Sequence, residues 1–253
     1  MATEPLIAVF IDFENLAIGV RDMKGDGKFH VELVIKRLLE KGRIVFKRAY
    51  CDWSQYREYT REFHAAGIEM VDIPQSRHSG KNSADIHMVT DALDLCYAKQ
   101  HIDIFALLSG DSDFSPLVSK LKENNKRVIG CGVKSSTSDL LIGGCDEFIY
   151  YDDLARAASK PRPARTAKAG QKDKKGEAMD RLVEIVESLE TDYDQLWGSM
   201  VKQTIRRVHP GFNETYFGYD SFSDLLKDAE NRGLIKLEYD SQRGNYLVRP
   251  VAR

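Results

Sequence analysis

Residues 102–116, IDIFALLSGDSDFSP, constrain the fold of this chain more than any other stretch. Ile102–Leu108 is an apolar run that only Asp103 interrupts, which is typical of a strand buried on both faces of a parallel sheet. The run ends in the polar residues 109–113, and Pro116 predicts the first turn of a helix, where its missing N–H is tolerated. Two carboxylates, from Asp111 and Asp113, therefore lie at a strand-to-helix transition, the usual ligand site of an open α/β sheet.

The rest of the first 155 residues alternates between apolar runs and helical periodicity. Strands are predicted over 6–11, 43–50, 68–73, 102–108, 127–133 and 147–151. Helices are predicted over 31–39, 54–64 (capped by Ser54), 83–99, 113–124 and 138–142. This alternation predicts right-handed crossovers and an open, mainly parallel sheet with helices on both faces.

A change of composition near residue 156 divides the chain. Residues 156–176 are rich in Lys and Arg and contain two prolines but no large apolar residue, which is typical of a flexible linker. We leave open whether it only tethers or also contacts nucleic acid. Residues 177–253 then predict three helices and a terminal hairpin, which together suggest a small winged-helix α+β domain.

The overall composition excludes few functions. The net charge of −2 says nothing global about a nucleic-acid partner. No apolar stretch approaches the length of a membrane span, and the N-terminal residues do not resemble a signal peptide, so we expect a cytoplasmic protein with no membrane partner. The four cysteines show no C-x-x-C pair, which predicts buried free thiols rather than a zinc site or disulfides.

Acidic residues gather at the predicted carboxyl edge of the sheet. With the first strand beside the fourth, Asp12 emerges next to Asp111 and Asp113, and Asp85 faces them from the first turn of the helix before the fourth strand. Four crowded carboxylates repel one another, so the site should hold a proton or bind a divalent cation. Oxygen ligands of this kind suit Mg²⁺ or Mn²⁺. Such ions activate water for hydrolysis of a phosphodiester.

Two polar neighbours complete this hypothesis. Asn15 would orient a metal-bound water or a phosphate oxygen, and Ser109 would hydrogen-bond a carboxylate or a substrate phosphate. Structural alternatives stay open for the acids, since Asp113 or Ser115 can cap a helix, Asp85 suits the helix dipole, and Asp12 can anchor a turn.

The polar loop over residues 74–82 is the predicted substrate contact of this edge. Arg77, His78 and Lys81 would hold the phosphate backbone without reading sequence, although a merely solvated loop is the alternative. Tyr50, Trp53 and Tyr56 would stack on unpaired bases or, as aromatic residues at a strand end more often do, join the core.

Three segments, VFIDFENL, KNSADIHMVTDAL and LLSGDSDFSPLVSKLKENNKRVIGCGV, closely resemble the NYN domain, the LabA-like branch of the PIN-like ribonucleases. The resemblance covers about residues 5–153. The family's acidic metal-binding residues fall on Asp12, Asp85, Asp111 and Asp113, with Asn15 as their neighbour. This resemblance implies cleavage of RNA that depends on Mg²⁺ or Mn²⁺. Asp91 lies six residues past Asp85, on another helix face, so we interpret it as structural or as supporting the metal ligands.

The segment GYDSFSDLLKDAENRGLIKL, after PGFNETYF, resembles the LOTUS (OST-HTH) domain over about residues 177–250. That family implies binding of RNA, including guanine-rich RNA, although some members bind a helicase instead. The predicted third helix of this region is acidic, which disfavours reading of a DNA groove. The candidate contacts to an RNA backbone are Lys202, Arg206 and Arg207 on the second helix and Arg243 in the wing. Docking of a protein partner is the competing interpretation.

The predicted function is therefore a metal-dependent ribonuclease with an attached RNA-binding domain. One rival is a regulator that binds RNA or recruits a protein without cutting. A second rival is a phosphohydrolase that forms an aspartyl-phosphate, which is disfavoured because Phe13 and Glu14 follow Asp12 where that chemistry commonly uses D-x-D. The oligomeric state is not predicted.

Overall fold

The computed structural model of this 253-residue chain describes residues 4–21, 23, 27–74, 83–159 and 174–251. The chain divides into two compact units, residues 1–160 and 161–253. Among the helices in the described part, none has the length and apolar character needed to cross a membrane.

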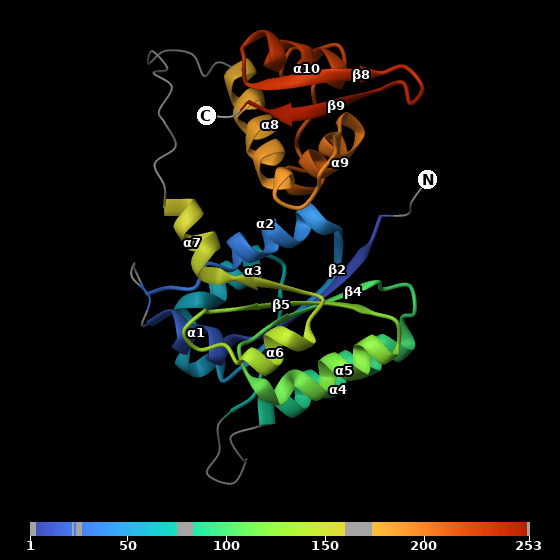
Figure 1. Ribbon diagram of the computed structural model, residues 1–253. Helices are drawn as coiled ribbons and strands as arrows, with labels where there is room; N and C mark the ends of the chain where they lie inside the picture. Colours follow the sequence, from blue (N-terminus) through green and yellow to red (C-terminus); the bar gives the residue numbers. More distant parts are fainter. Residues whose placement is uncertain (1–3, 22, 24–26, 75–82, 160–173, 252–253) are drawn as a thin grey trace. The chain divides into compact units, whose positions relative to one another are not determined.

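A six-stranded sheet forms the centre of the first unit, in the order β3-β2-β1-β4-β5-β6 (Figure 1). All five neighbouring pairs are parallel. The strands are β1 (Leu6–Asp12), β2 (Arg43–Cys51), β3 (Glu69–Asp72), β4 (Ile104–Leu108), β5 (Arg127–Gly132) and β6 (Glu147–Tyr150). The predicted α/β fold and the predicted neighbours β1 and β4 are confirmed.

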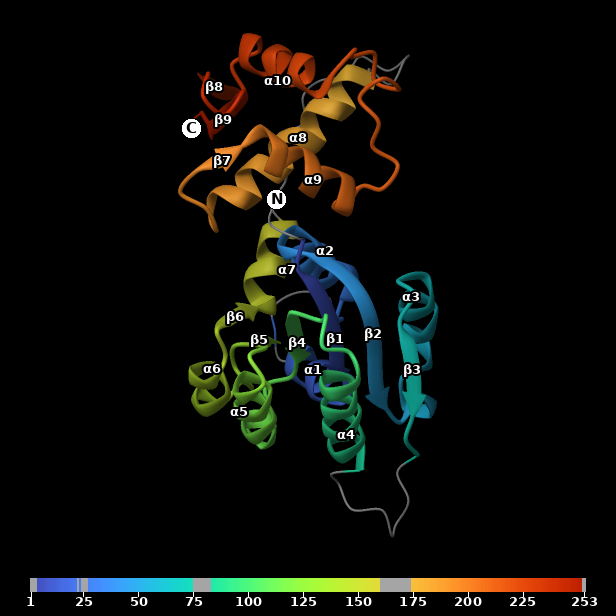
Figure 2. The same cartoon turned by 90° about the vertical axis from the view of Figure 1, so that its right-hand side faces the viewer.

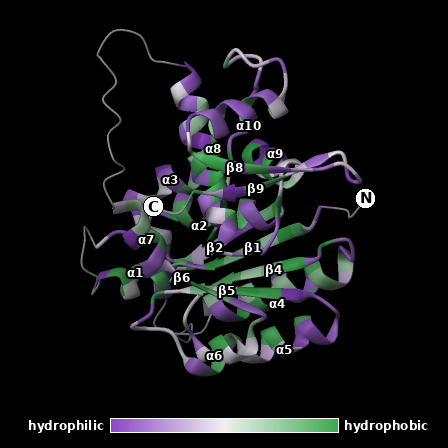
Figure 3. Ribbon diagram, turned by 45° about the horizontal axis from the view of Figure 1, so that its top comes forward, coloured by the Kyte–Doolittle hydropathy of each residue, from purple (hydrophilic) through white to green (hydrophobic). Residues whose placement is uncertain are grey.

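Helices cover both faces of this sheet, and the alternation of side chains along β1 separates the two faces. Ile7, Val9 and Ile11 pack in one core with α1 (Phe13–Arg21), α2 (Val31–Lys41), α3 (Thr60–Ala65) and α7 (Tyr151–Ser159). Ala8 and Phe10 pack in the other core with α4 (Ser83–Ala98), α5 (Ser115–Glu123) and α6 (Asp139–Gly144). In Figure 1, α2 and α7 lie above the sheet while α4 and α5 lie below it, and Figure 2 shows the same two layers from the side. The hydrophobic colour of Figure 3 is concentrated in the strands between them.

The segment after β2 differs from the predicted helix 54–64. Asp52, and not Ser54, is the capping residue, because its Oδ1 accepts a hydrogen bond from the Ser54 backbone N–H. Two 3₁₀ turns, η1 (Trp53–Gln55) and η2 (Arg57–Tyr59), precede the short helix α3. Tyr50, Trp53 and Tyr56 are at most 7% exposed, so all three belong to the core and do not form a base-stacking surface.

The second unit combines helices with a three-stranded antiparallel sheet in the order β7-β9-β8. Its elements are α8 (Lys174–Glu190), β7 (Leu196–Trp197), α9 (Gly198–Val208), α10 (Phe222–Asn231), β8 (Ile235–Asp240) and β9 (Asn245–Pro250). Ser221 caps α10 through its Oγ, and Gly233 ends that helix with a φ of 69°. The predicted hairpin is confirmed, and the arrangement is compatible with a winged helix. The sheet of this unit gains its third strand from Leu196 and Trp197, which form β7 directly before α9.

The ends of the predicted linker 156–176 are helical, since α7 extends to Ser159 and α8 begins at Lys174. Residues 160–173 lie outside the described residues. All four cysteines are free thiols, and three of them are buried, as the sequence predicts.

Candidate active site

Asp12 is the last residue of β1 and lies on the face of the sheet that α4 covers, because it follows Ala8 and Phe10 in the strand alternation. It is only 7% exposed. The Ser109 hydroxyl, just past the end of β4, donates a hydrogen bond of 2.8 Å to Asp12 Oδ2. The Asn15 backbone N–H donates to Asp12 Oδ1 at 3.3 Å. The adjacent ends of β1 and β4 are thus joined through this carboxylate.

The pKa of Asp12 is raised from 3.8 to about 7. Burial is the largest cause, and the negative charges of Asp85 and Asp111 add to it. The hydrogen bonds from Ser109 and Asn15 act in the opposite direction but are outweighed. Near neutral pH, ionisation of Asp12 therefore costs free energy, and a cation bound nearby would reduce this cost.

The turn that carries Asp111 is fixed to α1 and to its own first residues. Asn15 Oδ1 accepts a hydrogen bond of 2.9 Å from the Gly110 N–H, and the Asp111 N–H donates to Ser109 Oγ at 3.1 Å. Asp111 Oδ1 then accepts from the Asp113 N–H at 2.9 Å and caps the 3₁₀ turn η3 (Ser112–Phe114). Gly110 is needed here because a Cβ would lie 2.6 Å from the Ser136 carbonyl oxygen.

Asp85 lies in the first turn of α4 and is partly buried. Its pKa is raised from 3.8 to about 6 by burial and then by the negative charges of Asp111, Asp113 and Glu14. Asp85 is therefore within electrostatic range of Asp12, Asp111 and Asp113. Glu14 is a fifth acid that the sequence analysis did not assign, although its position between Asp12 and Asn15 was a usable signal.

The donor set has the chemistry of a Mg²⁺ or Mn²⁺ site, because it consists of carboxylate oxygens and the negative charges of neighbouring acids raise the pKa of Asp12 and of Asp85. A metal site also requires that the ligand side chains converge on one point. In the part of the chain that the structure describes, no three His, Cys, Asp or Glu side chains converge closely enough to hold a metal ion as they stand. The chemistry thus fits a divalent cation, while the ligand geometry stays a prediction.

The predicted RNA contacts fall in two places. Arg77, His78 and Lys81 lie outside the described residues. In the second unit, Lys202 and Arg206 both form ion pairs with Glu214, at 3.1 and 3.2 Å. Their positive charges are therefore shared with a buried carboxylate.

The two remaining predicted contacts also have neighbours within the second unit. Arg207 Nη2 donates to Thr204 Oγ1 at 2.8 Å. The guanidinium of Arg243 lies 4.7 Å from the centre of the Trp197 ring, within the range of a cation–π contact.

The fold and this acidic edge correspond to a known class. The NYN domain family matches residues 6–152, more than half of the chain, and the protein therefore belongs to the NYN domain family. NYN domains are part of the PIN-like nuclease superfamily, which supports a function of the nuclease type. The match ends within the first unit.

One similar solved structure is that of a protein of unknown function from Vibrio parahaemolyticus RIMD 2210633. It is 25% identical, with a TM-score of 0.53, and the alignment covers 61% of this chain and 97% of that one. It supports the fold of the first unit. No curated protein matches this chain.

Proposed function

We propose that this protein is a ribonuclease that hydrolyses phosphodiester bonds of RNA with the help of Mg²⁺ or Mn²⁺. The observation that carries the proposal is the buried Asp12 at the carboxyl end of β1, whose pKa is raised to about 7 beside Asp85 and Asp111. Membership of a nuclease superfamily supports it further. Groups with such shifted pKa values concentrate at active sites.

In this proposal, Asp12, Asp85, Asp111 and Asp113 hold the cation. When bound, the ion supplies an activated water and neutralises charge on the phosphodiester. The chain's own contribution is positioning, since Ser109 fixes the orientation of the Asp12 carboxylate through its 2.8 Å hydrogen bond.

Asn15 has two roles here. Its Oδ1 holds the turn at Gly110, and we assign its amide nitrogen to a phosphate oxygen. Arg77 and Lys81 are the proposed contacts of the substrate backbone.

For the second unit we propose a LOTUS-like RNA-binding role, with guanine-rich RNA as one candidate ligand. The proposed contacts are Lys202, Arg206, Arg207 and Arg243. Covalent attachment of such a unit raises the local concentration of RNA at the nuclease unit. Docking of a protein partner is the second candidate role, which the pairing of Lys202 and Arg206 with Glu214 favours because it reduces the charge available to RNA.

The direct test incubates labelled single-stranded RNA with the full chain in the presence of Mn²⁺ or EDTA. We expect cleavage with Mn²⁺ only, and we expect Asp12→Asn and Asp111→Asn to reduce it by about a thousandfold, on the order of 4 kcal/mol in activation free energy. Asp94→Asn is the matched control, because Asp94 lies on α4 but is exposed. Tight binding of RNA that stays intact would instead support the non-catalytic regulator.

A further inference from the structure

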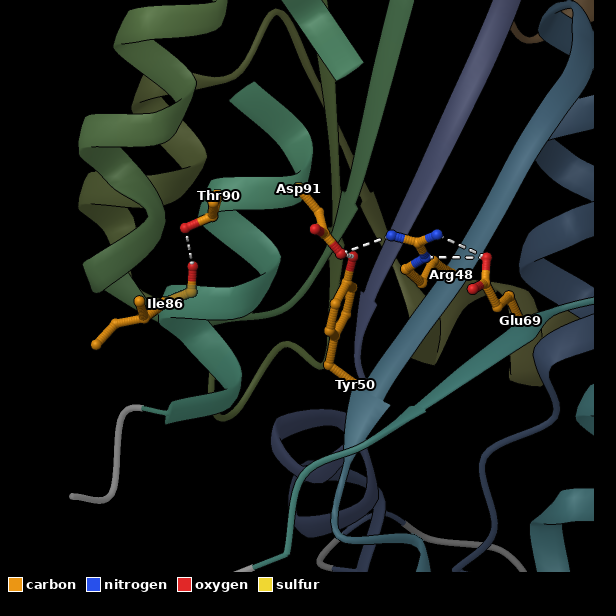
Figure 4. A network of polar contacts seen from close by, with 6 residues as sticks. All are labelled: Arg48, Tyr50, Glu69, Ile86, Thr90 and Asp91. Atoms are coloured by element: carbon orange, nitrogen blue, oxygen red, sulfur yellow. Dashed lines mark hydrogen bonds and ion pairs between the residues drawn. The ribbon is translucent and has the colours of Figure 1, made fainter. Parts of the chain in front are cut away.

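A partly buried polar network joins β2, β3 and α4 on the same side of the sheet as Asp12 (Figure 4). Arg48 Nη1 donates to Asp91 Oδ2 at 2.7 Å, and the Tyr50 hydroxyl donates to the same oxygen at 2.7 Å. On its other side, the guanidinium of Arg48 donates through Nε and Nη2 to Glu69 Oε2, at 3.0 and 2.8 Å. One carboxylate oxygen of α4 is thus held by two donors from β2.

The network lies directly beside the candidate active site. Tyr50 is paired with Asp12 in the parallel register of β1 and β2. Both residues point to the α4 side, where Phe10, Tyr50, Met88 and Ala92 share one core. Tyr50 is fully buried, and the pKa of its hydroxyl is raised by burial and by the hydrogen bond to Asp91, so the hydroxyl stays protonated and donates to Asp91.

Asp91 and Asp85 are carried by the same rigid helix. They are six residues apart, which in an α-helix corresponds to about 9 Å along the axis and roughly 120° around it. Asp91 can therefore face β2 while Asp85 faces Asp111 and Asp113. A rotation or a slide of α4 on the sheet would move both carboxylates together.

The contact between β2 and α4 is charge-assisted and tertiary. The bond between Arg48 and Asp91 joins two ions, and bonds of this kind are shorter and stronger than neutral ones. Burial alone would lower the pKa of Arg48, but its hydrogen bonds with Glu69 and Asp91 raise it, so the guanidinium stays charged. The partners lie on β2 and α4, 43 and 41 residues apart in sequence, so the contact is tertiary and not local.

We propose that Arg48 and Tyr50 are positioning residues of the nuclease site, which hold α4 through Asp91 in the register that presents Asp85 to Asp12 and Asp111. The proposal rests on the proposed function for the role of Asp85. Neither positioning residue touches the substrate or the ion. They act through the orientation of α4, as groups that support metal ligands do in other proteins.

The test uses two conservative variants of the full chain, Tyr50→Phe and Asp91→Asn. Tyr50→Phe removes one hydroxyl and keeps the buried ring, so this variant still tests the proposal if Asp91→Asn fails to fold. Thr90→Val is the matched control, because Thr90 is the neighbour of Asp91 on α4 and its Oγ1 donates only along the helix, to the Ile86 carbonyl at 2.8 Å (Figure 4).

Two readouts are needed. The first is amide hydrogen exchange of residues 84–88 in the metal-free protein, which reports local opening at the start of α4. The second is Mn²⁺ affinity, measured by calorimetry. We expect both variants to exchange faster in this segment and to bind Mn²⁺ about 10- to 100-fold more weakly, while saturating Mn²⁺ restores most of kcat and Thr90→Val matches the parent.

The outcomes separate the two proposals. Unchanged exchange at residues 84–88, or faster exchange with unchanged Mn²⁺ affinity, would overturn the positioning role. A parent protein that neither binds Mn²⁺ nor cuts RNA would overturn the proposed function instead. In that case the exchange measurement still decides whether Tyr50 and Asp91 hold the register of α4.

Discussion

The surroundings of a buried carboxylate shift its pKa in opposite directions in the two units. At the carboxyl edge of the first unit, Asp12 lies among other acids, and its pKa is raised to about 7. In the second unit, Glu214 is almost equally buried, but Lys202 and Arg206 reach it, and its pKa is lowered. A carboxylate with basic partners stabilises its fold, whereas one among acids opposes it. We therefore interpret the acidic edge as retained for chemistry and the Glu214 cluster as structural.

The helix α4 repeats this contrast within sixteen residues. Asp91 receives hydrogen bonds from Arg48 and Tyr50, while Asp85 is acted on by Asp111, Asp113 and Glu14. The same element thus offers one aspartate for anchoring and another for binding. The anchoring contact of Asp91 thus lies on the same helix as Asp85, whose acidic neighbours destabilise its charged form.

Among variants that test the contrast between Asp12 and Glu214, we expect Asp12→Asn to change the free energy of unfolding most. Because the folded-state pKa of Asp12 is raised from 3.8 to about 7, the folded protein holds this proton more tightly than the unfolded chain does. Ionisation of Asp12 therefore destabilises the folded protein. This destabilisation is small near pH 4, grows as the pH rises to 7, and is complete above that. We expect the metal-free variant to be more stable than the parent at pH 8 by about 2–4 kcal/mol, the difference in pKa less the lost hydrogen bonds.

Urea unfolding of both proteins in EDTA at pH 5 and pH 8 measures this difference. The difference in the free energy of unfolding between Asp12→Asn and the parent should be smaller at pH 5 than at pH 8. A variant that is less stable than the parent at pH 8 would show that Asp12 is a structural carboxylate.

A smaller effect of opposite sign is expected for Glu214→Gln. Burial alone would raise the pKa of Glu214, but hydrogen bonds from the backbone, Lys202 and Arg206 lower it. Its stabilising contribution is therefore present above its ordinary pKa of 4.5 and is lost as the pH falls through the lower folded-state value. We expect the variant to lose about 1 kcal/mol at pH 7, measured by chemical denaturation, and less near pH 4.

The same variant sharpens the proposed role of the second unit. If Lys202 and Arg206 bind the RNA backbone, their release from Glu214 should tighten RNA binding at low salt, as measured by fluorescence anisotropy. Unchanged RNA affinity would favour the protein-docking role. Asp224→Asn is the matched control for charge, because Asp224 lies on α10 and pairs with Ser221.

The sequence was sufficient for the six strands of the first unit and for the pairing of β1 with β4. Apolar runs gave the strands, and the parallel order put Asp12 beside Asp111 because these residues follow neighbouring strands. It did not predict α1, since the helix begins at Phe13 directly after β1, without a separating turn. It also did not predict the partners of Asp91 and Glu214. Such pairs depend on how helices and loops pack, which local periodicity does not encode.

The central claim is that the acidic edge needs a cation, and Mn²⁺-induced stabilisation tests it most directly. Calorimetric melting of the parent and of Asp12→Asn at pH 8, each in EDTA and in excess Mn²⁺, isolates the contribution of the site. At a Mn²⁺ concentration about 100 times the dissociation constant, the parent should gain about 2.7 kcal/mol, while the variant should gain little. Equal shifts in both proteins, or no shift in the parent, would contradict the claim.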